Sequence, residues 1–178
     1  MGNTSRWRGY NFEHTLVKRL NSLDNWDARR FGGSSAGFPD VVAVNNNKKI
    51  LLTLEAKTAT SDSIYVPPEQ IERCAEILDV FGVYEKKYAI LAFKFMSKRR
   101  FKSKDNSGYQ HRQIHEYYKV ANGLLKMKRI PTVKCMYDGR MFVIVNEVAK
   151  AVQLDDYAMP FQQNSVQKIM IRQRPRTS

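Results

Sequence analysis

The sequence is poor in the residue types that build zinc sites and disulfide frameworks. Its 178 residues include only two cysteines and three histidines. Cys74 and Cys135 are far apart, with no Cys-x-x-Cys motif and no histidine at ligand spacing. We therefore expect neither a zinc site nor a disulfide framework, and interpret both cysteines as buried free thiols.

Long hydrophobic runs are also missing. No run approaches the roughly 20 apolar residues of a membrane-spanning helix, and the polar N-terminus has no apolar segment typical of a secretory signal. We therefore expect no membrane partner and a cytoplasmic location. The 43% of apolar and 11% of aromatic residues are enough for the core of one domain.

Acidic residues are scarce relative to basic ones. Lysine and arginine number 30 against 17 aspartate and glutamate residues, which gives a formal net charge of +13. An excess of this size favours a polyanionic partner. We therefore expect nucleic acid rather than a small-molecule substrate.

The periodicity of the first half predicts a mixed α/β sheet. In chain order we expect an amphipathic helix at 10–23, a short strand at 26–31, a hairpin of strands 40–44 and 50–57, a helix from Pro67 to Gly82 and a strand at 86–93. The flexible glycine and serine loop at 32–37 precedes the hairpin. The 86–93 strand is nearly all apolar, which is typical of a strand inside a sheet.

The second half is more polar, and its pattern is weaker. A basic stretch at 96–112 predicts a mobile loop. We expect a helix at 111–127, a hairpin around Asp138-Gly139, a short helix at 146–154 capped by Asn146, and a basic tail that is partly disordered.

Three charged residues lie in segments that otherwise have the pattern of buried strands. Asp40 opens one apolar run, and Glu55 and Lys57 close the next. Burying charges is costly unless they are paired, hydrogen-bonded or bound to a metal. Glu55 and Lys57 share a face because a strand repeats every two residues. If Val44 lies near Ile50, antiparallel pairing also brings Asp40 close to Glu55.

This acidic pair has the chemistry of a phosphodiester-cleaving site. Hard divalent cations activate water and neutralise phosphate charge, and they prefer oxygen ligands. Asp40, Glu55 and the carbonyl of Ala56 would hold Mg²⁺, and Lys57 would orient or deprotonate the water or stabilise the phosphorane. The plainer alternative is that Asp40 caps a turn and Glu55 pairs with a lysine on an exposed strand.

These residues also carry a family resemblance. Pro39-Asp40 followed by Glu55-Ala56-Lys57 resembles the PD-(D/E)xK signature of restriction-endonuclease-like nucleases. The order and spacing of four segments resemble the archaeal Holliday junction resolvase family over about residues 8–95: RGYNFEHTLVKRL, GGSSAGFPDVVAV, LLTLEAKT and IYVPPEQIERC. The resemblance implies an α/β, restriction-endonuclease-like core with a central mixed β-sheet flanked by helices and a basic insertion after the fourth strand.

The resemblance also implies further site residues. Glu13 matches an extra acidic metal ligand on the early helix, Ser34 or Ser35 a serine important for cleavage, and Gln70 a glutamine near the catalytic centre. Without the resemblance, Glu13 would be a glutamate favoured by the helix dipole, and the others would be ordinary loop or helix residues. The implied cofactor is Mg²⁺, with Mn²⁺ as a possible substitute.

Basic residues near these segments are candidates for phosphate contacts. Against a polyanion they would bind by counterion release, whereas in most proteins they would form a solvated face. They are Arg6, Arg8, Arg29, Arg30, Lys98, Arg99, Arg100, Lys102 and Lys104. Tyr109, Tyr117 and Tyr118 could stack on bases, although tyrosines at helical spacing usually pack.

The resemblance implies a nuclease domain at 1–160, with a basic insertion at about 97–131 and a basic tail at 161–178. We expect a Mg²⁺-dependent endodeoxyribonuclease, associated with the nucleoid, that acts as a homodimer and resolves four-way DNA junctions by paired symmetric nicks. Two alternatives stay open: a related nuclease for flaps, forks or duplexes, and a non-catalytic basic DNA-binding protein of the same fold.

Overall fold

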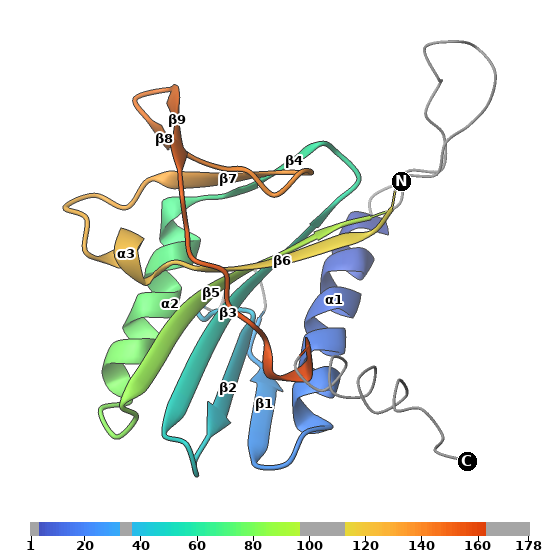
Figure 1. Cartoon of the computed structure of the whole chain (residues 1–178), viewed down its shortest axis with the longest axis vertical. Coiled ribbons are helices and arrows are strands. Elements are labelled where there is room, and N and C mark those ends of the chain that lie inside the picture. Colours follow the sequence, from blue (N-terminus) through green and yellow to red (C-terminus); the bar gives the residue numbers. More distant parts are fainter. Residues whose placement is uncertain (1–3, 33–36, 97–112, 163–178) are drawn as a thin grey trace, which may run out of the picture.

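The computed structural model describes residues 4–32, 37–96 and 113–162, with side chains from Trp7 onward (Figure 1). In chain order the elements are α1 (Thr4–Asn21), β1 (Trp26–Arg30), β2 (Val41–Asn45), β3 (Ile50–Ala59), β4 (Ser63–Val66), α2 (Pro68–Val80), β5 (Lys86–Phe95), β6 (His115–Val120), α3 (Asn122–Leu125), β7 (Thr132–Met136), β8 (Met141–Val145) and β9 (Val148–Val152).

The central sheet has five strands in the order β1-β2-β3-β5-β6. All neighbours are antiparallel except β3 and β5, which are parallel and are joined through β4 and α2. The expected short strand, the hairpin, the crossover helix and the internal strand are therefore confirmed. The mixed sheet flanked by helices is the predicted nuclease-like fold class.

Both faces of this sheet are buried. Leu51 and Leu52 are adjacent in β3, point to opposite faces and belong to separate core clusters. Leu51 packs with Ile71 of α2, and Leu52 packs with Leu16 of α1. Because both faces of β3 are covered, its six consecutive residues 51–56 are all buried.

The two long helices follow their sequence patterns. In α1, Phe12, Leu16 and Leu20 recur every four residues and are buried. Pro68 begins α2, where its missing N–H leaves no hydrogen bond unmade. The expected helices at 10–23 and 67–82 are confirmed, although α1 begins earlier, at Thr4.

A second sheet of four strands, β4-β7-β8-β9, packs over the α2 side of the first (Figure 1). The hairpin at Asp138-Gly139 is confirmed, with Cys135 paired to Met141 and Gly139 at a φ of +84°. The sequence pattern at 63–66 predicted no strand, yet these residues form β4 and pair with β7. Cys74 and Cys135 are buried free thiols, as expected.

The expected helix at 111–127 is wrong. Residues 111–112 lie outside the described residues, His115–Val120 forms β6, and α3 covers only one turn. Strand β6 pairs with β5 from Phe95↔His115 to Ile90↔Val120 and completes the central sheet. Hydrogen bonds to a neighbouring strand outweigh a weak local helical pattern, particularly for a tyrosine-rich segment.

The expected short helix at 146–154 is also wrong. Asn146 and Glu147 have positive φ, 49° and 64°, and form the two-residue turn between β8 and β9. Positive φ at both central residues is typical of a type I′ hairpin turn. Asn146 is therefore a turn residue and caps no helix.

The described part of the 97–131 segment contains β6 and α3, so it contributes an edge strand of the central sheet. The expected loop at 96–112 lies almost wholly outside the described residues, as does the tail beyond residue 162. No helix among the described residues is long and apolar enough to cross a membrane.

We predict that Gly139→Ala destabilises the junction between the two sheets. An added Cβ would lie 2.9 Å from the ring of Tyr117, at a φ unfavourable for other residues. The free energy of unfolding should fall by at least about 2 kcal/mol in denaturant titration. Gly123→Ala, where nothing lies within 4 Å, is the matched control and should change it by less than about 1 kcal/mol. Equal effects of the two substitutions would contradict this packing.

Candidate active site

Strands β2 and β3 bring Asp40 against Glu55. Val41 pairs with Leu54, so the constant index sum is 41 + 54 = 95 and the next position matches Asp40 with Glu55. The register assumed from the sequence, Val44 near Ile50, is off by one residue, because Val44 pairs with Leu51. The expected proximity of Asp40 and Glu55 is nevertheless confirmed.

A cleft of about 510 Å³ opens over this pair. Helix α1, the end of β1, residues just after β1 and just before β2, strand β3 and helix α2 all contribute to its wall. It is lined by Gly9, Tyr10, Glu13, Arg30, Gly32, Phe38, Asp40, Glu55, Ala56, Lys57, Thr58, Gln70 and Arg73. Every described residue assigned to catalysis or metal binding from the sequence is therefore in one cleft.

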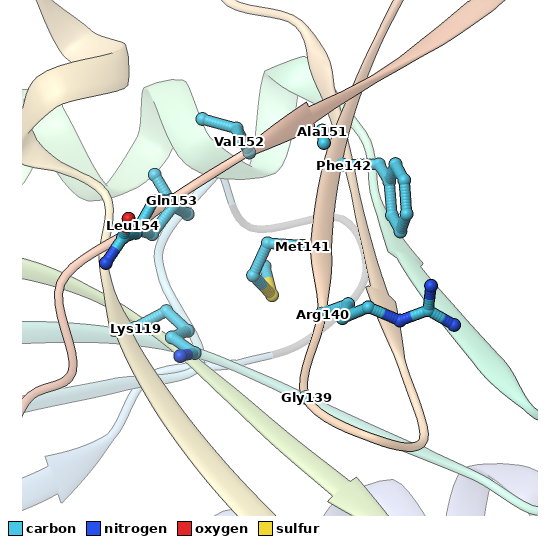
Figure 2. Close-up of a pocket in the computed structure, with 9 residues that line it drawn as sticks. All are labelled: Lys119, Gly139, Arg140, Met141, Phe142, Ala151, Val152, Gln153 and Leu154. Atoms are coloured by element: carbon cyan, nitrogen blue, oxygen red, sulfur yellow. The ribbon is translucent and has the colours of Figure 1, made fainter.

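Another hollow, of about 230 Å³, lies between β6 and the β8–β9 hairpin (Figure 2). Among the described residues that line it, none is acidic, and apolar side chains such as Met141 and Leu154 predominate. Its buried cation, Lys119, is held by Asp156 at 2.6 Å. This hollow offers no carboxylate oxygens, so the acidic cleft is the candidate site.

Lys57 lies between the two strand carboxylates. Its Nζ donates to Glu55 Oε1 at 2.5 Å and lies 4.0 Å from Asp40 Oδ2. The same Asp40 oxygen accepts a hydrogen bond from the Ala56 N–H at 2.8 Å. Asp40 is thereby tied to the backbone of β3, and Glu55 and Lys57 share a face as predicted.

Glu55 is the most strongly perturbed carboxyl of the cleft. It is 2% exposed, and its Oε2 has no hydrogen-bond partner among the described residues. Burial raises the pKa of Glu55 to about 7, and the negative charge of Asp40 adds to this rise. The hydrogen bond from Lys57 and the charge of Arg73 act in the opposite direction. A buried carboxylate with an open oxygen is the kind of group that a cation would satisfy.

Helix α1 adds Glu13 to the cluster. Glu13 is 9% exposed, and burial together with the charge of Asp40 raises its pKa. Arg30 Nε donates to Glu13 Oε2 at 2.5 Å, and the guanidinium lies 4.6 Å from the Tyr10 ring centroid. Arg30, predicted as a phosphate contact, is therefore the counterion of Glu13 in this structure.

Gly32 has no side chain, which allows the carboxylates of Asp40 and Glu13 to lie close to its backbone. A Cβ at Gly32 would lie 2.9 Å from Asp40 Oδ1 and 3.3 Å from Glu13 Oε2. Only glycine leaves this space open. The sequence contained a glycine-rich loop, but nothing in it distinguished Gly32 from its neighbours.

Helix α2 supplies two polar side chains one turn apart. Gln70 Oε1 is buried without a hydrogen-bond partner among the described residues, in the same cleft as Glu55. Arg73 also lines the cleft, and no hydrogen bond or ion pair joins it to another described residue. We did not single out Arg73 from the sequence, although its i+3 spacing from Gln70 places both on one helix face.

The remaining predicted residues are only partly described. Arg8 is half-buried on α1, and exposed Arg29 pairs with Asp27 at 2.8 Å. The side chain of Arg6 lies outside the described residues, as do Ser34, Ser35, Lys98, Arg99, Arg100, Lys102, Lys104 and Tyr109. Tyr117 and Tyr118 pack against Phe95 and Phe161, consistent with a structural role.

The cleft contains oxygen atoms of the kind that a hard divalent cation prefers as ligands. Carboxylates from Glu13, Asp40 and Glu55 line the cleft beside Ala56, and the partnerless oxygens of Glu55 and Gln70 are hydrogen-bond acceptors. Among the described residues, however, no group of three or more aspartate, glutamate, histidine or cysteine side chains is placed so that it could hold a metal ion. Lys57 and Arg30 instead neutralise the carboxylates.

We predict that Gly32→Ala weakens binding of a divalent cation. The added methyl group would push Asp40 and Glu13 out of their present positions. Affinity for Mn²⁺, measured by calorimetry, should fall about tenfold or more, while circular dichroism stays native. Gly82→Ala, which has open space around it, should leave the affinity unchanged. Unaltered Mn²⁺ binding by Gly32→Ala would contradict the assignment.

The pKa of Glu55 predicts a pH-dependent stability in EDTA. The folded chain retains a proton on Glu55 up to about pH 7, whereas the unfolded chain loses it near its ordinary value of 4.5. The contribution of Glu55 to the free energy of unfolding is complete below pH 4.5 and is lost as the pH rises through 7. The pKa difference, 7 − 4.5, corresponds to on the order of 3 kcal/mol.

Denaturant titrations at pH 4.5 and 8 should therefore show a smaller loss of stability in Glu55→Gln than in the unmodified chain. Glu116 provides a control, because the pKa of its carboxyl is lowered whereas that of Glu55 is raised. Hydrogen bonds from Lys94, Arg19 and Tyr118 outweigh burial and lower its pKa, so its contribution is lost as the pH falls. Identical pH profiles of the unmodified chain and Glu55→Gln would refute the prediction.

Comparison with solved structures adds a relative of known structure. The Holliday junction resolvase Hjc of Archaeoglobus fulgidus, a hyperthermophilic archaeon, is 19% identical. The similarity covers 74% of this chain and 85% of that protein, with a TM-score of 0.47. No curated protein matches this sequence.

Comparison with family profiles gives a match to the archaeal Holliday junction resolvase (Hjc) family over residues 4–124. The matched region runs from the start of α1 through β6 and into α3, and it contains all the acidic residues of the cleft. It leaves out β7, β8 and β9, which form most of the second sheet. Because the match covers more than half of its residues, the chain belongs to the archaeal Holliday junction resolvase family.

Proposed function

We propose that this chain is a Mg²⁺-dependent, structure-selective endodeoxyribonuclease that resolves four-way DNA junctions. The observation that supports the proposal most directly is the convergence of Asp40, Glu55 and Lys57 in one cleft. This is the arrangement that the PD-(D/E)xK signature requires. The net charge of +13 suits a DNA substrate.

In the proposed mechanism Asp40, Glu55 and Glu13, with the Ala56 carbonyl, would hold Mg²⁺, with Mn²⁺ as a substitute. The bound ion supplies Lewis-acid stabilisation of the phosphate and a water of lowered pKa. The water oxygen bonds to phosphorus and releases a proton to solvent, the bond from phosphorus to the leaving oxygen breaks, and the leaving oxygen takes up a proton from solvent. The residues of the chain keep the reacting groups aligned.

Lys57 acts on the phosphate side of this reaction. Its ammonium donates to Glu55 and lies near Asp40, so it carries protons to donate. It would therefore stabilise negative charge on the phosphorane oxygens and orient the water. Gln70, whose oxygen is buried without a partner among the described residues, would accept a hydrogen bond from the same water.

Several further assignments belong to the same proposal. Arg8, Arg29 and Arg30 would contact DNA phosphates near the cleft, with Arg6 and the basic residues of 98–104 as additional contacts. Ser34 or Ser35 would assist cleavage. A homodimer would present two cleavage sites to a junction with matching twofold symmetry and would place nicks in opposing strands.

We predict that Asp40→Asn, Glu55→Gln and Lys57→Ala each slow the cutting of a synthetic immobile junction at least about 100-fold. Binding to the junction should survive, because phosphate contacts elsewhere remain. Single-turnover cleavage with and without Mg²⁺, and gel-shift titration, measure the two properties. Asp138→Asn, in the exposed turn between β7 and β8, and Lys150→Ala, on exposed β9, should cut normally.

The same assay distinguishes the alternatives when flap, fork and linear duplex DNAs are included. Symmetric, ligatable nicks in the four-way junction support a resolvase, and preferred cutting of another DNA supports a related nuclease. Binding without any Mg²⁺-dependent cutting supports a non-catalytic DNA-binding protein. Near-normal cutting by any one of the three cleft variants would exclude the proposed chemistry.

A further inference from the structure

Two exposed phenylalanines lie at the rim of the acidic cleft. Phe31 is 48% exposed and Phe38 is 44% exposed, and their ring centroids are 6.0 Å apart. Phe38 lines the cleft itself. Aromatic surface left in water is unfavourable, and a pair of such rings beside a charged cleft indicates a surface for a ligand.

Hydrogen bonds fix this pair next to the acidic cluster. The backbone N–H groups of Phe31 and Gly32 donate to the carbonyl of Asp40 at 3.0 and 3.2 Å. Phe38 precedes Asp40 by two residues, which limits their separation to about 7 Å. That distance is the rise of about two nucleotides along one DNA strand. A base next to a phosphate at Asp40 would therefore lie within reach of the rings.

The surroundings of the rings favour a particular ligand. Three cations, Arg30, Lys57 and Arg73, line the cleft beside Phe38. A partner that suits both features has an anionic backbone and a flat apolar face, which is the chemistry of a nucleotide whose base is free to stack. In linear duplex DNA each base is stacked on both neighbours, whereas opening the arms of a branch point interrupts this stacking and exposes base faces.

We propose that Phe31 and Phe38 form a stacking contact for an unstacked base at a DNA branch point. This inference rests on the proposed function, because it requires branched DNA in the acidic cleft. The pair contributes to the preference for branched over linear DNA, a selectivity that phosphate contacts alone do not provide. The stacking contact does not discriminate between base sequences, because every base has a flat face on which an aromatic ring can stack.

The chain contains a matched control for this pair. Phe81 follows α2, is 42% exposed, and lies 6.4 Å from the Tyr84 ring in an edge-on arrangement. Neither ring lines the acidic cleft. Helix α2 ends far from the start of α1 in Figure 1, so Phe81→Ala removes a comparable exposed ring away from the proposed DNA path.

The test uses the full chain with Lys57→Ala, which slows cutting, in Mg²⁺. The probes are a four-way junction and a linear duplex of the same arm sequence, with 2-aminopurine at the branch point or in the middle of an arm. Phe31→Ala and Phe38→Ala should weaken junction binding about fivefold or more and leave duplex binding within about twofold. They should also reduce the protein-induced fluorescence rise at the branch point, whereas Phe81→Ala changes neither measurement.

Two conservative variants separate stacking from simple loss of apolar area. Phe38→Tyr keeps the ring and should bind like the parent chain, whereas Phe38→Leu keeps the apolar volume without a ring face and should behave like Phe38→Ala. Equal junction-to-duplex ratios in the parent, Phe31→Ala and Phe38→Ala chains would overturn the inference. So would equal fluorescence at the branch point and in mid-arm.

This result is independent of the cleavage assay. If the chain with Lys57 intact cuts no DNA but its branch-point signal depends on Phe31 and Phe38, catalysis fails and the stacking contact stands. If it cuts junctions and the phenylalanine variants bind them normally, the proposed function stands and the stacking contact is excluded.

Discussion

The burial of the Glu55 carboxylate in β3 is the constraint on which the site depends. A carboxylate that is 2% exposed is costly unless a charge partner accompanies it. Lys57, two residues later on the same strand face, is that partner at 2.5 Å. Asp40 enters the cluster because the register of β2 and β3 is fixed by their apolar faces, and its bond to the Ala56 N–H holds it there. A register shift of one residue would turn the whole cluster toward the wrong face.

The sheet topology brings the rest of the site to the same place. The parallel pair β3 and β5 requires a crossover, and its helix α2 begins beside the carboxyl end of β3. Gln70 and Arg73 in its first two turns therefore face Glu55. Helix α1 covers the opposite face and adds Glu13 from the side. Both long helices and the central sheet thus contribute side chains to one cleft, and the two core clusters pack these elements together.

Much of this was predictable, and the failures have definite physical causes. Helices α1 and α2, the hairpin and β5 have strong local periods, and the pattern of Asp40, Glu55 and Lys57 follows from the strand period and antiparallel pairing. Strand β6 was missed because its stability comes from β5, and β9 because the turn at Asn146-Glu147 uses an uncommon residue at positive φ. Gly32 and Arg73 acquire their positions only when distant segments meet.

The cations of the cleft connect stability with the proposed chemistry. Three carboxylates in one cleft repel each other, as the raised pKa values of Glu13 and Glu55 indicate, with burial as the larger cause. Lys57 and Arg30 offset this repulsion in the folded chain. The side chain of Arg30 is 35% exposed and rests on Tyr10, so its pairing with Glu13 is only partly desolvated and contributes little stability. A divalent ion that takes over the neutralisation of Glu13 would free the Arg30 guanidinium for a phosphate at low cost. In the proposed function, the guanidinium that neutralises Glu13 in the free chain would therefore be available to a DNA phosphate once the metal is bound.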